Sequence, residues 1–195
     1  MTWREAKLER LRDGAPRAHL LKRAYPRISA DTPAQACKGT WMDIFYYWKD
    51  YESHLKAGAL GWLHFPRAKL AEIKGRHPDW IWAFKQPARR KGDVQLLARL
   101  RWIDAPATKL AVEKDASVIY YDPSESLLFT DTDDDQKISE MTSMMRSRFP
   151  NAFGVNFRGD ARVQAMEADL LAQLRPKVAT YATEPFPGSL IAVAS

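Results

Sequence analysis

The feature that most constrains the fold of this chain is a block of strand-like segments over residues 59–129, bounded on both sides by segments of helical period. Within the block, residues 80–84 alternate bulky and small side chains as a half-buried strand does, and residues 94–103 and 117–121 carry further apolar runs of strand type. Strands gathered in one block favour an α+β fold over an alternating βαβ series. The sequence therefore predicts α+β, with a small mixed or antiparallel, or else barrel-like, central sheet of four to five strands flanked by N-terminal and C-terminal helices.

Turn-forming residues divide this block. Residues 87–92 (PARRKG) separate the strands at 80–84 and 94–103. Residues 122–125 (DPSE) combine Asp, Pro and Ser, which are the residue types that favour turns. They predict a hairpin turn that leads into a last strand at 127–129.

The stretch before the block predicts a core helix over residues 40–57. Its apolar side chains recur at helical spacing and define one face, which consists of Trp41, Ile44, Phe45, Trp48 and Leu55. A threonine at the start is a suitable N-cap, and Gly58 supplies the stop. Beyond Gly58, residues 59–65 predict a strand, and residues 66–73 predict a short helix that begins with a proline and is ended by a glycine.

The region after the block, residues 135–175, predicts two C-terminal helices. The first spans residues 135–148, and the aspartates that precede it suit the N-terminus of a helix. The second spans residues 160–174, with Asp160 as its N-cap and Pro176 as its end.

The remaining segments complete a single predicted domain of residues 1–195. Residues 1–30 are basic and predict a helical N-terminal segment. Residues 176–195 contain Pro185 and Gly188 and predict an extended tail or a late edge strand. A chain of 195 residues suits one hydrophobic core, or at most a domain with an appendage.

The composition of the chain restricts its possible binding partners and its cellular location. Lys and Arg outnumber Asp and Glu by 30 to 24, a net charge of +6, which permits a polyanionic partner such as nucleic acid. No stretch approaches the roughly 20 apolar residues of a membrane span, the N-terminus lacks a signal-peptide core, and Cys37 is the only cysteine. No phosphate-binding glycine motif is present. We therefore expect a cytoplasmic protein with no membrane association and no cofactor.

A basic hairpin tip is the first candidate site. If residues 80–84 and 94–103 pair, the loop between them projects three cations towards phosphates. The candidate nucleic-acid-binding residues are Lys85, Arg89, Arg90, Lys91, Arg99 and Arg101. The alternative is a solvated hairpin tip with no ligand.

The second candidate is a base-stacking pocket. Indole rings on a small curved sheet can accept an unpaired or flipped base between them. Its predicted members are Trp62, Trp80, Trp82, Trp102 and His64. The alternative is that these side chains simply pack the core. Together with the basic tip, the pocket predicts a nucleic-acid-binding module.

Two other functions stay open. A metal-dependent nuclease needs acidic ligands, and Asp43, Asp50 and Glu52 with His54 nearby offer such groups on the predicted helix. Exposed carboxylates on an amphipathic helix are the simpler interpretation, so no metal site and no catalytic residue are predicted. A protein-interaction or oligomerisation domain explains the Trp and Met content equally well. The choice between DNA and RNA, and the oligomeric state, do not follow from the sequence.

Overall fold

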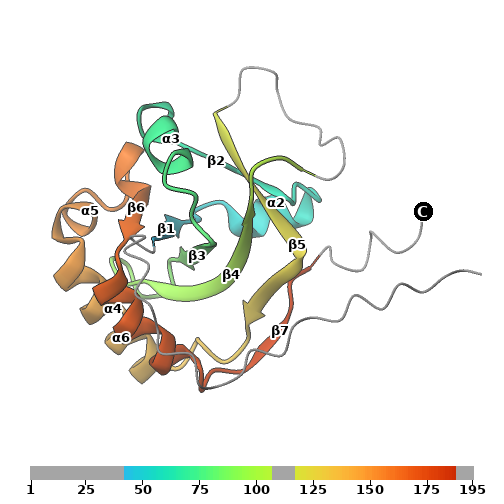
Figure 1. Cartoon of the computed structure of the whole chain (residues 1–195). Coiled ribbons are helices and arrows are strands. Elements are labelled where there is room, and N and C mark those ends of the chain that lie inside the picture. Colours follow the sequence, from blue (N-terminus) through green and yellow to red (C-terminus); the bar gives the residue numbers. More distant parts are fainter. Residues whose placement is uncertain (1–41, 107–116, 188–195) are drawn as a thin grey trace, which may run out of the picture. The chain divides into compact units, whose positions relative to one another are not determined.

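The computed structural model describes residues 42–106 and 117–187 (Figure 1). Every described residue belongs to one compact unit, Gly39–Ser195. The predicted helical segment at residues 1–30 therefore lies outside the described residues.

One mixed sheet forms the centre of this unit. Its strands are β1 (Asp43–Tyr47), β2 (Trp62–His64), β3 (Trp80–Lys85), β4 (Gln95–Ile103), β5 (Val118–Phe129), β6 (Val163–Met166) and β7 (Thr183–Pro185). The order is β2-β5-β4-β3-β1-β6, and β7 pairs with β5. Only the pairing of β1 with β3 is parallel among these strands. The six strands of the main path curl into half a barrel (Figure 1). The α+β class and the mixed sheet are thus confirmed.

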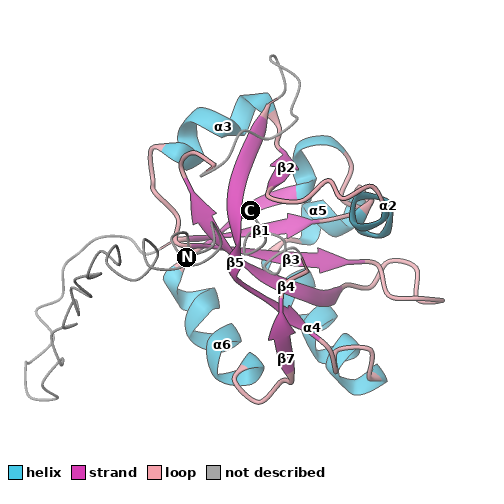
Figure 2. Cartoon of the chain, turned by 90° about the vertical axis from the view of Figure 1, so that its right-hand side faces the viewer, coloured by secondary structure: helices cyan, strands magenta, loops and turns pink. Residues whose placement is uncertain are grey.

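Helices cover the sheet on both faces. They are α2 (Tyr51–Lys56), α3 (Arg67–Lys74), α4 (Asp135–Arg148), α5 (Pro150–Gly154) and α6 (Ala168–Val178), with a short 3-10 helix at Gly159–Arg162. The predicted helix at 135–148 is confirmed, and the side chain of Asp134 caps it by accepting from the amides of Gln136 and Lys137. Figure 2 shows α4 and α6 on one side of the sheet and α3 on the other.

The central strands separate two hydrophobic clusters. Ile44 and Ile81 point to the first cluster, which α2 and α3 help to close. Phe45 and Trp82, one residue further along the same strands, point to the second cluster beneath α4, α5 and α6. Strands buried on both faces carry continuous apolar runs instead of an alternating pattern.

This double burial explains why the predicted core helix at residues 40–57 is wrong. Residues 43–47 form strand β1, all five of them buried, and only Tyr51–Lys56 are helical. An unbroken apolar run satisfies a helical face and a strand buried on two sides equally well, so the spacing did not distinguish them. Gly58 follows α2 with a φ of 63°, as expected of a helix stop. Residues 40 and 41 lie outside the described residues.

The predicted hairpin at residues 122–125 is also wrong, because β5 continues through it. The register with β4 steps from Arg99 opposite Leu127 to Arg101 opposite Asp122, so the extra residues of β5 form a bulge. The turn chemistry is nevertheless used locally. The amide of Ser124 donates to Oδ1 of Asp122 over 2.8 Å, as in an Asx turn.

The predicted helix at residues 160–174 with an Asp160 cap is wrong as well. Residues 163–166 form β6, and α6 begins at Ala168 and runs past Pro176 to Val178. Val163 and Met166 have the spacing of one helical face, but their pairing with β1 decides the structure. The sequence also predicted an edge strand as one option for the tail, and β7 confirms it by pairing with β5.

Candidate anion-binding groove

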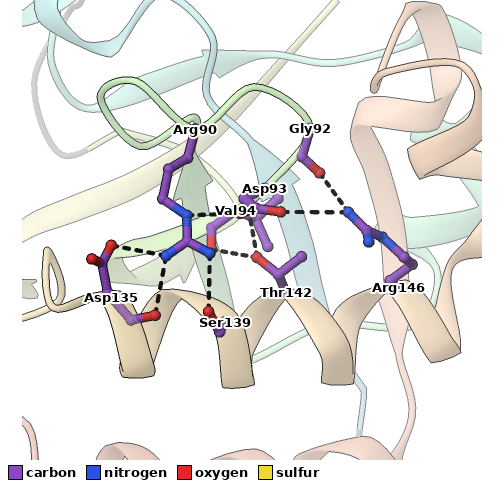
Figure 3. Close-up of polar contacts among 8 residues, drawn as sticks. All are labelled: Arg90, Gly92, Asp93, Val94, Asp135, Ser139, Thr142 and Arg146. Carbon is purple, nitrogen blue, oxygen red and sulfur yellow. Dashed lines mark hydrogen bonds and ion pairs between the residues drawn. The ribbon is translucent and has the colours of Figure 1, made fainter.

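An open polar groove of about 470 Å³ lies between the β3–β4 loop and α4 (Figure 3). Its lining residues are Arg90, Asp93, Ser139, Thr142, Ser143, Arg146 and Ser147. The loop belongs to the predicted basic tip, whereas α4 was not part of any predicted site. The groove thus joins one expected element to one that sequence reasoning missed.

Thr142 fixes the base of the loop to the middle of α4. Its side chain is buried, and Oγ1 accepts from the amide of Val94 over 3.0 Å and donates to the carbonyl of Val94 over 3.3 Å. Arg89 and Gly92 then turn the chain with positive φ angles of 63° and 85°. The loop is therefore held at one end by a buried side chain and shaped by two left-handed residues.

Arg90 clamps the loop to the first turns of α4 (Figure 3). Its guanidinium donates to Asp93 over 2.9 Å, to the Asp135 carboxylate over 2.9 Å and to Ser139 Oγ over 2.9 Å. Desolvation opposes the charged form, but the hydrogen bonds to Asp135 and Asp93 outweigh it and raise the pKa of Arg90. Arg90 is therefore a positioning residue, because acceptors within the protein already occupy its donors.

The other end of the groove carries Arg146. Its Nη2 donates to the carbonyl of Gly92 over 2.9 Å, and Oδ1 of Asp93 lies 3.5 Å away. The guanidinium also lies 5.0 Å from the ring centroid of Phe153. With 55% of the side chain exposed, Arg146 retains donors that face solvent.

A stripe of serines completes the groove. Ser139, Ser143 and Ser147 are spaced four residues apart on α4, which places them on one face of the helix. This spacing is visible in the sequence, but only the structure shows that the β3–β4 loop lies opposite these serines and forms a groove with them. Hydroxyls beside a partly exposed guanidinium are groups that bind oxyanions.

The three predicted tip cations have separate roles. Arg90 turns inward onto α4, whereas Arg89 and Lys91 are exposed. Among the residues that the structure describes, neither Arg89 nor Lys91 makes an ion pair. These two exposed side chains flank Arg90 in the loop that borders the groove.

The other predicted cations lie outside the groove. Lys85 pairs with Glu52 over 3.2 Å. Arg99 and Arg101 lie further along β4, where both guanidiniums cover the ring of Trp80, at 4.4 Å and 5.1 Å from its centroid. The structure thus does not bring the six predicted cations into one patch.

The four predicted indoles do not converge either. Trp82 is fully buried in the cluster beneath α6, whereas Trp102 belongs to the cluster on the opposite face. Trp62 is on β2, which β5 and β4 separate from Trp80 on β3. Among the predicted pocket members, the ring of Trp62 contacts that of His64 alone, with 4.9 Å between the ring centroids. No base-stacking pocket forms from these residues in the described part of the chain.

Asp43 lies apart from the rest of the predicted acidic set, since Glu52 and His54 are on α2 and Asp50 precedes it. Asp43 is 1% exposed, on a strand, and accepts from Nε1 of Trp82 over 2.9 Å and from Arg175 over 3.2 Å. Its expected place on the polar face of a helix was wrong, because residues 43–47 form a strand. Within residues 42–106 and 117–187, no three His, Cys, Asp or Glu side chains are grouped to hold a metal ion. No helix in these ranges is long and apolar enough to span a membrane.

The attachment of the loop is testable through its buried hydroxyl. Thr142→Val removes the acceptor of the Val94 amide, so we expect the free energy of unfolding to fall by about 1–2 kcal/mol in urea titrations. Ser143→Ala, one position along the same helix, is the matched control and should change stability by less than about 0.5 kcal/mol. Equal losses in both variants would show that Thr142 does not anchor the loop.

Comparison of the chain with protein-family models, with curated proteins and with solved structures gave no match.

Proposed function

We propose that the chain is a binding module that contacts the phosphate backbone of nucleic acid through the β3–β4 loop and the adjoining groove. The observation that supports this most directly is the arrangement around Arg90. The loop is fixed to α4 by a clamp that uses one cation, Arg90, and the flanking cations Arg89 and Lys91 are exposed. Arg146 of α4 donates to the carbonyl of Gly92 in the same loop.

Rigid presentation matters for phosphate binding. A long cationic side chain loses conformational entropy when it binds, and a preformed backbone limits the additional cost of ordering the loop. The hydroxyl of Ser143 lies in the same groove and is a suitable second donor to a phosphate oxygen. Such contacts recognise the backbone and carry no sequence information.

The distribution of charge supports a local contact at the loop. Residues 42–106 and 117–187 contain 19 Lys or Arg and 18 Asp or Glu, a balance of +1 out of the total of +6. Residues 1–41 contain nine basic and four acidic residues and hold the remaining excess of five. The described part of the chain therefore lacks a strong general field, and its contribution to binding rests on the loop cations, with residues 1–41 as a further basic segment.

Base stacking is not part of this proposal, because Trp82 and Trp102 are buried on opposite faces of the sheet. The two other functions expected from the sequence have no specific support. Asp93, the carboxylate in the groove, is paired with Arg90 and Arg146. Val155 is the single large apolar side chain that is exposed among the described residues, which does not favour an interaction domain.

The test is a charge reversal on the loop. We expect Arg89→Glu/Lys91→Glu to weaken binding of a labelled single-stranded DNA or RNA oligonucleotide at least about tenfold at about 50 mM salt, measured by fluorescence anisotropy. Loss of two phosphate contacts should also reduce the slope of log K against log salt concentration by about 1.4.

The matched control is Lys56→Glu/Lys74→Glu. It makes the same change of net charge on α2 and α3, the helices that close the opposite cluster. Because general electrostatic attraction would weaken equally in both variants, only a loop-specific loss supports the proposal. If the loop variant binds within about twofold of the control, the loop is not the binding surface.

A further inference from the structure

Arg99 is a half-buried guanidinium that has no acceptor. Its Nε is buried without a hydrogen-bond partner, and its guanidinium makes no hydrogen bond with the other described residues. The group instead lies over two indole rings, 4.4 Å from the centroid of Trp80 and 5.8 Å from that of Trp82. The ring faces attract the charge but accept none of the in-plane N–H groups.

The neighbouring arginines differ from Arg99 because each has a carboxylate partner. Arg101 pairs with Asp79 over 3.1 Å, and Arg175 of α6 reaches the buried Asp43 over 3.2 Å. These pairs leave Arg99 as the cation without a counter-charge in this cluster.

The electrostatic surroundings of Arg99 also disfavour its charged form. Desolvation lowers its pKa, the positive charge of Arg175 lowers it further, and Asp43 only partly opposes both. A cation held in this way is stabilised by an external anion, and a planar guanidinium with all its outer donors unused is suited to a bidentate oxyanion.

We propose that Arg99, together with Arg175, binds one oxyanion group, a phosphate or a carboxylate of a small ligand. The Arg175 side chain is 49% exposed, so it retains donors on the solvent side while it holds Asp43. The oxyanion lies between the two guanidiniums and offsets their mutual repulsion.

This site is independent of the proposed function. Arg99 follows Val94, at the base of the groove loop, by five residues along extended backbone, which separates the two by roughly 17 Å. Different variants therefore test the two proposals, and either can fail alone.

Trp80 and Trp82 supply the measurement, because their indoles contact the guanidinium that binds the ligand. Inorganic phosphate and acetate are titrated separately into the full chain in a chloride buffer. We expect a saturable change in tryptophan fluorescence for at least one of them. We also expect an increase in Tm of about 3 °C at a concentration near ten times Kd. The arm that saturates at lower concentration identifies the phosphate or the carboxylate.

Arg99→Gln should weaken the anion affinity at least about tenfold, whereas Arg158→Gln, which removes the same charge from an exposed position at the start of the 3-10 helix, should leave it within about twofold. If Arg99→Gln does not fold, Arg99→Lys is measured instead, since it keeps the charge and loses the planar fork. Unchanged affinity in the Arg99 variant, or a wild-type chain that responds to neither anion up to about 50 mM, would overturn the proposal.

Discussion

Replacing Asp43 by alanine is expected to lower the free energy of unfolding by about 3 kcal/mol. Asp43 is 1% exposed and accepts the indole N–H of Trp82, which is itself fully buried. Without the carboxylate, that donor has no partner, and the guanidinium of Arg175 loses its acceptor at the edge of the cluster. Because Arg175 is half exposed, water replaces part of its contact, so most of the loss comes from the orphaned indole. Urea unfolding at neutral pH measures the change.

Two comparisons separate this cause from simple loss of volume. Asp43→Asn keeps an oxygen acceptor for Trp82 and should cost clearly less than alanine. Trp82→Phe removes the donor, so Asp43→Ala in that background should cost about 1–2 kcal/mol less than in the wild-type chain. Additive losses in this double-mutant cycle would show that the hydrogen bond between the two side chains does not carry the effect.

The second large effect is a loss of stability at alkaline pH. Burial raises the pKa of Tyr46 from 10.0 to about 12, and Arg162 opposes this only in part. Between these values the phenol ionises in the unfolded chain and stays neutral in the folded one. The contribution of Tyr46 is therefore constant below pH 10 and is lost as the pH rises to about 12. Two pKa units correspond to about 3 kcal/mol.

Tyr46→Phe identifies the residue responsible. The variant loses the hydrogen bond from the phenol to the carbonyl of His64, which lowers stability by a similar amount at every pH below 10. It should also flatten the alkaline decline, so the curves of wild type and variant converge above that pH. Burial raises the pKa of Tyr121 as well, and its ionisation adds to the decline in both proteins alike. Parallel curves up to about pH 12 would contradict the assignment to Tyr46.

The sequence predicted the fold class and those elements whose residue pattern fits one type of secondary structure alone. Residues 80–84 alternate and lie in β3, and the aspartates before residue 135 do begin α4. The prediction was wrong where one residue pattern fits both a helix and a strand. The apolar run at 44–47 fits a helix or a doubly buried strand, and only the pairing of β1 with β3 and β6 distinguishes them. Long-range pairing of this kind is not encoded in local periodicity.

The candidate site was predictable only in its loop. The cationic cluster at residues 89–91 was evident, but the inward turn of Arg90 depends on Asp135 and Ser139, more than forty residues away along the chain. The predicted pocket of indole rings does not form, for a related reason. Tryptophan content predicts burial or a surface site equally, and the strand order places Trp62, Trp82 and Trp102 apart.

The outer edge of β5 has a consequence for solubility. An unpaired edge strand of twelve residues would offer a template for another chain. β2 pairs with its first part at residues 118–120, and β7 pairs with its last part at residues 127–129. Between them lies the bulge, where Pro123 has no N–H to offer. Because each covering strand is only three residues long, the edges that remain are too short to start intermolecular sheet growth, so this face should resist aggregation even in concentrated solution.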